Sequence, residues 1–130
     1  MEDRFKFRIV VKTKVKTLAG NFDHISIYPC NGFIQTKQKI KFRSGAKDFS
    51  FYSHQVVAIL QSTGLRDKNG TLIYDGDICL FENNYIYTVK FEKGCFYTDA
   101  YSDFDPLYRF KNIEVLGNIY ENKELLNERE

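Results

Sequence analysis

Residues 63–78 read TGLRDKNGTLIYDGDI, and this stretch places two tight turns around one short strand. In Asn69-Gly70 and in Asp75-Gly76, the glycine supplies the positive φ angles that such turns demand. The acids of the stretch are predicted to hydrogen-bond the backbone of these turns rather than to catalyse a reaction. Its apolar side chains are predicted to enter the core; they are Leu65, Leu72, Ile73 and Ile78.

The composition of the 130-residue chain favours β structure. Twelve Phe and nine Tyr stand against only two Pro and eight Gly, and aromatic side chains suit a pleated, half-buried surface. No apolar window is long enough for a transmembrane helix, and charges interrupt the start of the chain, so neither a membrane anchor nor a signal peptide is expected. Three cysteines without a C-x-x-C pair are typical of reduced thiols. We therefore expect a cytoplasmic protein.

Two segments, 5–17 and 33–43, alternate between apolar and basic residues. Because successive side chains of a strand point to opposite faces, each segment is predicted to form one strand with an apolar face and a basic face. The predicted basic positions are Lys6, Arg8, Lys12, Lys14, Lys16, Lys37, Lys39, Lys41 and Arg43. Asn31-Gly32 between the two segments predicts a hairpin turn.

The rest of the chain predicts short antiparallel strands separated by turns. A strand over 77–81 is followed by strands over 85–91 and 95–99, with a turn at Gly94, and the last strands cover 107–110 and 113–117. Residues 49–61 fit a strand and a short helix equally well, and residues 99–106 read as an acidic loop. This spacing predicts a mainly β fold, at most α+β, with a basic antiparallel subdomain at 1–48 and a small barrel with a C-terminal helix at 49–130.

Three segments resemble the YopX family of phage and prophage proteins. They are TGLRDKNGTLIYDGDI, the hairpin YTVKFEKGCF at 87–96, and IEVLGNIYENKELL at 113–126, with FKFR at 5–8 as a shorter match. The resemblance covers residues 60–126 well and residues 9–58 poorly. It implies a mostly β protein with an SH3-like barrel in its C-terminal half, encoded by a phage or prophage. The resemblance implies no biochemical activity, and it provides no catalytic residues to carry over to this sequence.

Charge divides the chain unevenly. Residues 1–56 carry eleven Lys or Arg and four acids, a net of +7, whereas residues 57–130 carry eight and thirteen, a net of −5. The nine cations on the two basic segments have three explanations: binding of a nucleic acid, binding of an acidic protein surface, and a solvated outer sheet face. A homo-oligomer joining the basic part of one copy to the acidic part of another is a further alternative.

No pattern in the sequence indicates an enzyme. There is no phosphate-binding glycine loop and no nucleophile elbow, and the two histidines have no acid or cysteine at metal-ligand spacing. Asp99, Asp103 and Asp105, with Asp75 and Asp77, could hold a cation but are better explained as a solvated loop. We expect no catalytic residues, metal or cofactor, and a non-enzymatic accessory protein that binds a host nucleic acid, nucleoprotein or defence protein. Self-assembly and nucleotide binding remain as alternatives.

Overall fold

The computed structural model describes residues 6–92, 95–100, 103–106 and 110–128, and it is mainly β. Among these residues there is no α-helix, only short 3-10 turns. The first strands are β1 (Phe7–Thr17), β2 (Gly20–Cys30), β3 (Phe33–Gln35), β4 (Lys39–Ser44), β5 (Lys47–Tyr52) and β6 (Val56–Arg66), with the 3-10 turn η2 (Ser53–Gln55) before β6. The others are β7 (Leu72–Tyr74), β8 (Asp77–Phe81), β9 (Tyr85–Glu92), β10 (Cys95–Ala100), β11 (Asp103–Pro106) and β12 (Ile113–Asn118), followed by the 3-10 turn η4 (Lys123–Glu128).

The chain divides into two compact units, and the boundary lies between Gln61 and Ser62. The sequence placed it after residue 48. The later boundary follows from strand pairing, because β5 pairs with β4 and the first half of β6 pairs with β1. The expected ambiguity at 49–61 resolves into the end of β5, the turn η2 and the start of β6.

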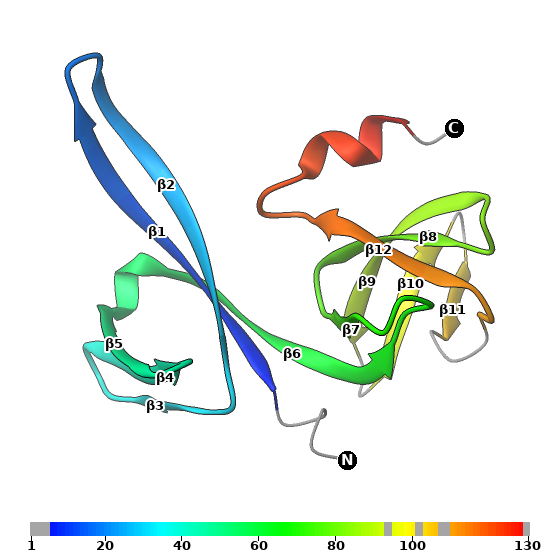
Figure 1. The fold of residues 1–130 in the computed structure, drawn as a ribbon, viewed down its shortest axis with the longest axis horizontal. Helices are drawn as coiled ribbons and strands as arrows, with labels where there is room; N and C mark the ends of the chain where they lie inside the picture. The colour runs from blue at the N-terminus through cyan, green and yellow to red at the C-terminus, as the bar shows by residue number, and fades with distance from the viewer. Residues whose placement is uncertain (1–5, 93–94, 101–102, 107–109, 129–130) are drawn as a thin grey trace. The chain divides into compact units, whose positions relative to one another are not determined.

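The first unit contains two sheet layers. In one layer β1 pairs with β2 and with the first half of β6, and in the other β4 pairs with β3 and β5 (Figure 1). Odd-numbered side chains of β1, among them Ile9 and Val11, pack with Ile40 and Phe42 of β4 in one core cluster. The alternation in the sequence therefore gives β1 its buried face, as expected.

Aromatic rings fill this core. Tyr28 of β2 lies 4.5 Å from Phe49 and 5.7 Å from Phe42, measured between ring centroids. Phe42 stacks on both Phe49 and Phe51, at interplanar angles of 17° and 24°. Such ring pairs contribute about 0.5–1.5 kcal/mol each beyond the area that they bury. They fix the inner face of the small sheet and leave its other face outward.

Residues 33–43 do not form one strand, which corrects the expectation for the second basic segment. The chain turns back at 36–38 and becomes the hairpin of β3 and β4. The Thr36 hydroxyl closes the turn, because it accepts a hydrogen bond from Lys39 N at 3.1 Å and donates one to Lys39 O at 3.2 Å. Lys37 therefore lies in the turn and not in the basic row of β4.

Asn31-Gly32 is a corner rather than a hairpin turn. The strands on either side, β2 and β3, belong to different sheets and do not pair. Gly32 is not among the glycines with positive φ, so this position does not need the glycine backbone that the turn prediction assumed. The chain uses the corner to pass from one layer of the unit to the other.

The main sheet of the second unit is curled and antiparallel, with strand order β11-β10-β9-β8-β12, and beside it β7 pairs with the end of β6. The sheet curls into a half-barrel, and the structure confirms the mainly β fold that the sequence and the resemblance predicted. The core gathers around Phe81, which is fully buried and packs against Tyr87 and Phe110 at ring distances of 6.0 and 4.7 Å. The expected strands at 77–81, 85–91 and 113–117 correspond to β8, β9 and β12.

The first motif (residues 63–78) and the second motif (residues 113–126) contact each other in this unit. Asp67 is buried, and its carboxylate accepts hydrogen bonds from Asn69 N at 2.9 Å, Thr71 N at 2.8 Å and Val115 N at 2.9 Å. Ile119 N donates to Gly76 O at 3.0 Å. Residues 63–78 are thus joined to 113–119 by backbone contacts, which makes both motifs part of the scaffold.

Several expected turns have the backbone that they need. Gly70 and Gly76 adopt φ angles of 84° and 88°, and Asp77 accepts a hydrogen bond from Tyr74 N at 2.9 Å. Gly94 and residues 107–109 of the expected strand at 107–110 lie outside the described residues. The expected acidic loop at 99–106 is instead a hairpin of β10 and β11, and the C-terminal helix is the 3-10 turn η4. No helix of the described chain is long and apolar enough to cross a membrane.

Candidate nucleic-acid interface

The predicted cations lie in two rows that face away from each other within the first unit. One row, on β1, contains Arg8, Lys12, Lys14 and Lys16; the other, on β4, contains Lys39, Lys41 and Arg43. The inner faces of β1 and β4 share one core cluster, so the exposed cations of β1 and of β4 lie on opposite layers. On β1 the basic face is exposed from Lys12 onward, because Arg8 is half-buried and Val10 beside it is fully buried. Lys6 precedes β1 and Lys37 lies in the turn after β3. The nine cations therefore do not form one continuous surface.

The outer face of the small sheet holds the row on β4, which we call the β4 row (Lys39, Lys41 and Arg43). Strand register gives this face its other members, because cross-strand partners share a face. Lys41 stands between Ile34 and Ser50, and Arg43 is opposite Asp48. The Arg43 guanidinium lies 3.9 Å from the Asp48 carboxylate, and both side chains are largely exposed.

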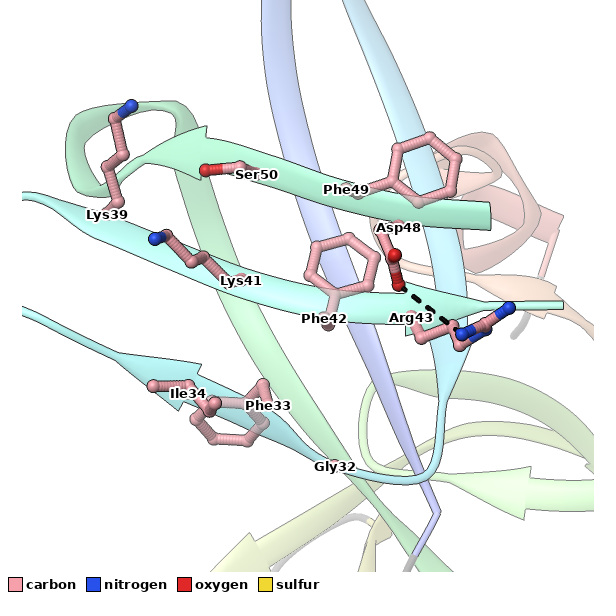
Figure 2. A pocket seen from close by; sticks show the side chains of 10 residues that line it. All are labelled: Gly32, Phe33, Ile34, Lys39, Lys41, Phe42, Arg43, Asp48, Phe49 and Ser50. Carbon is pink, nitrogen blue, oxygen red and sulfur yellow. Dashed lines mark ion pairs between the residues drawn. The ribbon is translucent and has the colours of Figure 1, made fainter. Parts of the chain in front are cut away.

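A hollow of about 620 Å³ lies over this sheet. Figure 2 shows the β4 row along one strand, with the Arg43–Asp48 pair at one end. The residues that line the hollow are Gly32, Phe33, Ile34, Lys39, Lys41, Phe42, Arg43, Asp48, Phe49 and Ser50. A volume of this size is within the range of ligand sites, and its lining combines cations, a hydroxyl group and apolar carbon.

Tyr52 provides an aromatic platform beside the β4 row, and no pattern in the sequence had indicated it. Its side chain is 50% exposed and lies opposite Lys39, whose Nζ is 5.1 Å from the ring centroid. The ring stacks on His54 at 5.6 Å and 11° between planes. Tyr52 N donates to Gln55 Oε1 at 2.9 Å, so the turn η2 fixes the backbone that carries the ring.

The second row lies on a two-stranded ribbon. We use "the ribbon" for residues 12–25, the part of β1 and β2 beyond the pairing of β1 with β6, which ends at Val11 (Figure 1). Lys12, Lys14 and Lys16 are exposed on one face. Asp23 of β2 lies on the same face, and its carboxylate is 3.5 Å from Lys12 Nζ.

The acidic residues do not assemble a metal centre in the described part of the chain. No group of three or more His, Cys, Asp or Glu side chains there could hold a metal ion. Asp75 is half-buried, and this burial raises the pKa of its carboxyl despite hydrogen bonds from Phe91 N and Gly76 N. The side chains of Asp99, Asp103 and Asp105 lie outside the described residues.

Comparison with known protein families assigns the chain to a family. The family model described as YopX protein matches residues 6–127. The chain belongs to the YopX family. No curated protein matches it. The match includes both basic strands, which the resemblance read from the sequence left largely outside. In this YopX-family protein the residues of the long motifs serve the scaffold, because Asp67 and Gly76 hold the first motif to the second.

The cysteines of this YopX-family protein are free thiols. Burial raises the pKa of Cys30, although a hydrogen bond from the Gly32 backbone lowers it in part. Burial also raises the pKa of Cys79 far above its usual value, and the charges of Asp77 and Asp67 add to this increase. Because the thiolate is the reactive form, neither buried cysteine is suited to redox chemistry near neutral pH.

Alkylation should therefore separate the three cysteines. In the native protein we expect iodoacetamide to modify Cys95, which is exposed, and to leave Cys30 and Cys79 unmodified over the same time. In denaturant all three should react, because unfolding removes the burial that keeps the two thiols protonated. Intact mass spectrometry counts the adducts. Rapid modification of Cys79 in the native state would show that the core of the second unit is open.

Proposed function

We propose that this protein is a non-enzymatic binding protein whose β3–β4–β5 sheet binds a single-stranded nucleic acid on its outer face. One observation carries the proposal: a row of cations runs beside the exposed ring of Tyr52, whose centroid lies 5.1 Å from Lys39 Nζ. Proteins that bind single strands combine these two elements, since cations follow the phosphates and aromatic rings stack on bases.

The geometry of the β4 row suits an extended polyanion. Alternate residues of a strand are about 6.6 Å apart, so its three cations are spread along an open sheet face instead of converging on one point. Neutralising several phosphates gives an affinity that falls steeply with salt. Ile34, 67% exposed beside Lys41, adds apolar surface for a base or sugar.

Tyr52 is the reason to favour a nucleic acid over an acidic protein surface. Lysine and arginine attract carboxylates and phosphates alike, but a base can also stack on a tyrosine ring, whereas an acidic side chain has no aromatic face to offer. In the phage or prophage setting that the family resemblance implies, the bound strand would belong to the host or to one of its nucleoproteins. An acidic host protein is the alternative partner.

Binding of a labelled oligothymidine or oligouridine, followed by fluorescence anisotropy at about 50 and 200 mM salt, tests the proposal. Tyr52→Ala should weaken binding about tenfold, because stacking contributes about 1–3 kcal/mol per base. Asp48→Asn should strengthen it, because it removes the acid that pairs with Arg43. A gain in affinity cannot be explained by a loss of folding.

The controls separate the proposal from its alternatives. Lys123→Glu changes an exposed charge in the second unit and should leave the affinity for the oligonucleotide unchanged. Polyglutamate should bind more weakly than the oligonucleotide and should not respond to Tyr52→Ala. Equal responses of both polymers to Tyr52→Ala would point to an acidic protein as the partner. No binding at the lower salt concentration would reject the proposed function.

A further inference from the structure

The ribbon carries a second row of cations whose surroundings differ from those of the β4 row. Its basic face holds Lys12, Lys14 and Lys16, whose cross-strand partners are Ile25, Asp23 and Asn21, so no aromatic ring lies among them. A narrow cationic ribbon without an aromatic platform does not match a single-strand site. It matches a surface that reads the backbone and edges of a duplex.

We propose that the ribbon is an arm that enters the major groove of duplex DNA with its basic face toward the DNA. The major groove of B-form DNA is about 12 Å wide and admits a two-stranded β-ribbon. Paired strands are about 4.8 Å apart, so two strands with their side chains fit this width. The major groove of duplex RNA is too narrow and deep for side chains to read, so the arm should prefer DNA.

The tip of the ribbon presents an exposed apolar side chain on a turn that side-chain hydrogen bonds hold. Its turn centres on Leu18 and Ala19, although such turns usually favour glycine, asparagine or aspartate. Leu18 is fully exposed, at 111%. The Thr17 hydroxyl stiffens the turn, because it accepts a hydrogen bond from Ala19 N at 3.2 Å and donates one to Gly20 O at 3.1 Å. In the groove this apolar tip would meet a thymine methyl group, the apolar feature of that groove.

The opposite face of the ribbon supplies a matched control. Val15 and Phe22 are cross-strand partners there and are 42% and 54% exposed. The cations on the other face can approach a phosphate backbone without involving this pair. Phe22→Ser therefore tests whether binding uses the basic face of the ribbon or its apolar face.

The test compares a labelled DNA duplex with the single strand of the same sequence, using the full chain. Lys14→Gln should weaken duplex binding several-fold and lower the slope of affinity against salt by about one. Asp23→Asn should strengthen duplex binding, because it releases Lys12 from its ion pair. Leu18→Ser should weaken duplex binding and Phe22→Ser should not. None of the four should change single-strand binding by the sheet.

Two further measurements show which groove of the duplex the ribbon occupies. Methylation of guanine N7 should interfere with binding, whereas netropsin, a ligand of the minor groove, should not compete. Competition by netropsin, equal affinity for duplex RNA, or a loss with Phe22→Ser equal to that with Lys14→Gln would overturn the proposal. The proposed DNA-binding arm does not depend on the proposed function of the sheet. If Tyr52→Ala loses single-strand binding but keeps duplex binding, both sites are supported separately. Duplex binding without any single-strand binding would reject only the function of the sheet.

Discussion

Replacing Asp67 by alanine should lower the free energy of unfolding by about 4 kcal/mol, the largest stability effect that we expect for one side chain. The variant loses three hydrogen bonds from backbone N–H groups and leaves those donors without their acceptor. The donor at Val115 belongs to β12, so the change also removes one of the hydrogen bonds that join the second motif to the first. Urea denaturation followed by tyrosine fluorescence measures the difference.

Asp67→Asn separates charge from shape. Its amide oxygen can replace one carboxylate oxygen, so about half of the loss should return. Asp48→Asn, an exposed acid in the first unit, should change stability by less than about 0.5 kcal/mol. If Asp67→Ala matched this control, the contact between the two motifs would not hold the second unit together.

The pH dependence of stability gives a second readout for Asp67. Burial raises the pKa of its carboxyl, but the hydrogen bonds from Val115, Thr71 and Asn69, with the charge of Lys68, outweigh burial and lower it. Because its folded pKa is below its unfolded pKa, its contribution is fully present above the unfolded value of about 3.9 and is lost as the pH falls through the folded pKa. Asp67→Asn should therefore flatten the fall of stability in acid.

Reversing two charges of the β4 row should cause the largest change in binding. In Lys41→Glu/Arg43→Glu, two attractive contacts become repulsive, so the affinity for a single strand should fall about a hundredfold at low salt and the salt slope should decrease by about two or more. Both side chains are exposed, so the fold should be retained. Circular dichroism and the thermal midpoint verify this.

The matched control reverses two cations of the ribbon, in Lys14→Glu/Lys16→Glu. These residues carry the same charge on the opposite layer of the same unit. Single-strand affinity should stay within about twofold of the parent protein for this control, because distant exposed charges are largely screened. Equal losses for both double variants would mean that binding follows net charge and not the surface that we propose.

Part of the fold could be predicted because the chain marks it with local signals. β8 has turn residues on both sides, Asp75-Gly76 before it and Glu82-Asn83 after it, and both Glu82 and Asn83 adopt positive φ. β1 has a long alternating pattern that predicts the strand, although its burial follows the pattern only in part: Ile9, Val10 and Val11 are all buried, and Lys14 to Thr17 are all exposed. The spacing of short strands predicted a small barrel. No local pattern specifies how far such a sheet closes, because closure depends on contacts between distant strands.

The parts that could not be predicted depend on contacts between residues distant in sequence or on side-chain hydrogen bonds. The turn at Thr36 contains no glycine or proline, because a hydroxyl group closes it. The unit boundary was placed too early because β6 pairs with β1, which lies almost fifty residues before it. Tyr52 was missed because η2 breaks the alternation just after it, and only the pairing with Lys39 shows that its ring is exposed.

The central claim is that a single strand lies on the outer face of the β3–β4–β5 sheet and stacks on Tyr52. Photocrosslinking with an oligonucleotide that contains 5-iodouracil tests it most directly, because the activated base reacts with the aromatic ring on which it stacks. Mass spectrometry of the digested adduct identifies the attached residue. We expect the crosslink on Tyr52 and its loss in Lys41→Glu/Arg43→Glu. A crosslink on Phe22 or Tyr85, both exposed aromatic residues elsewhere, with none on Tyr52, would contradict the account.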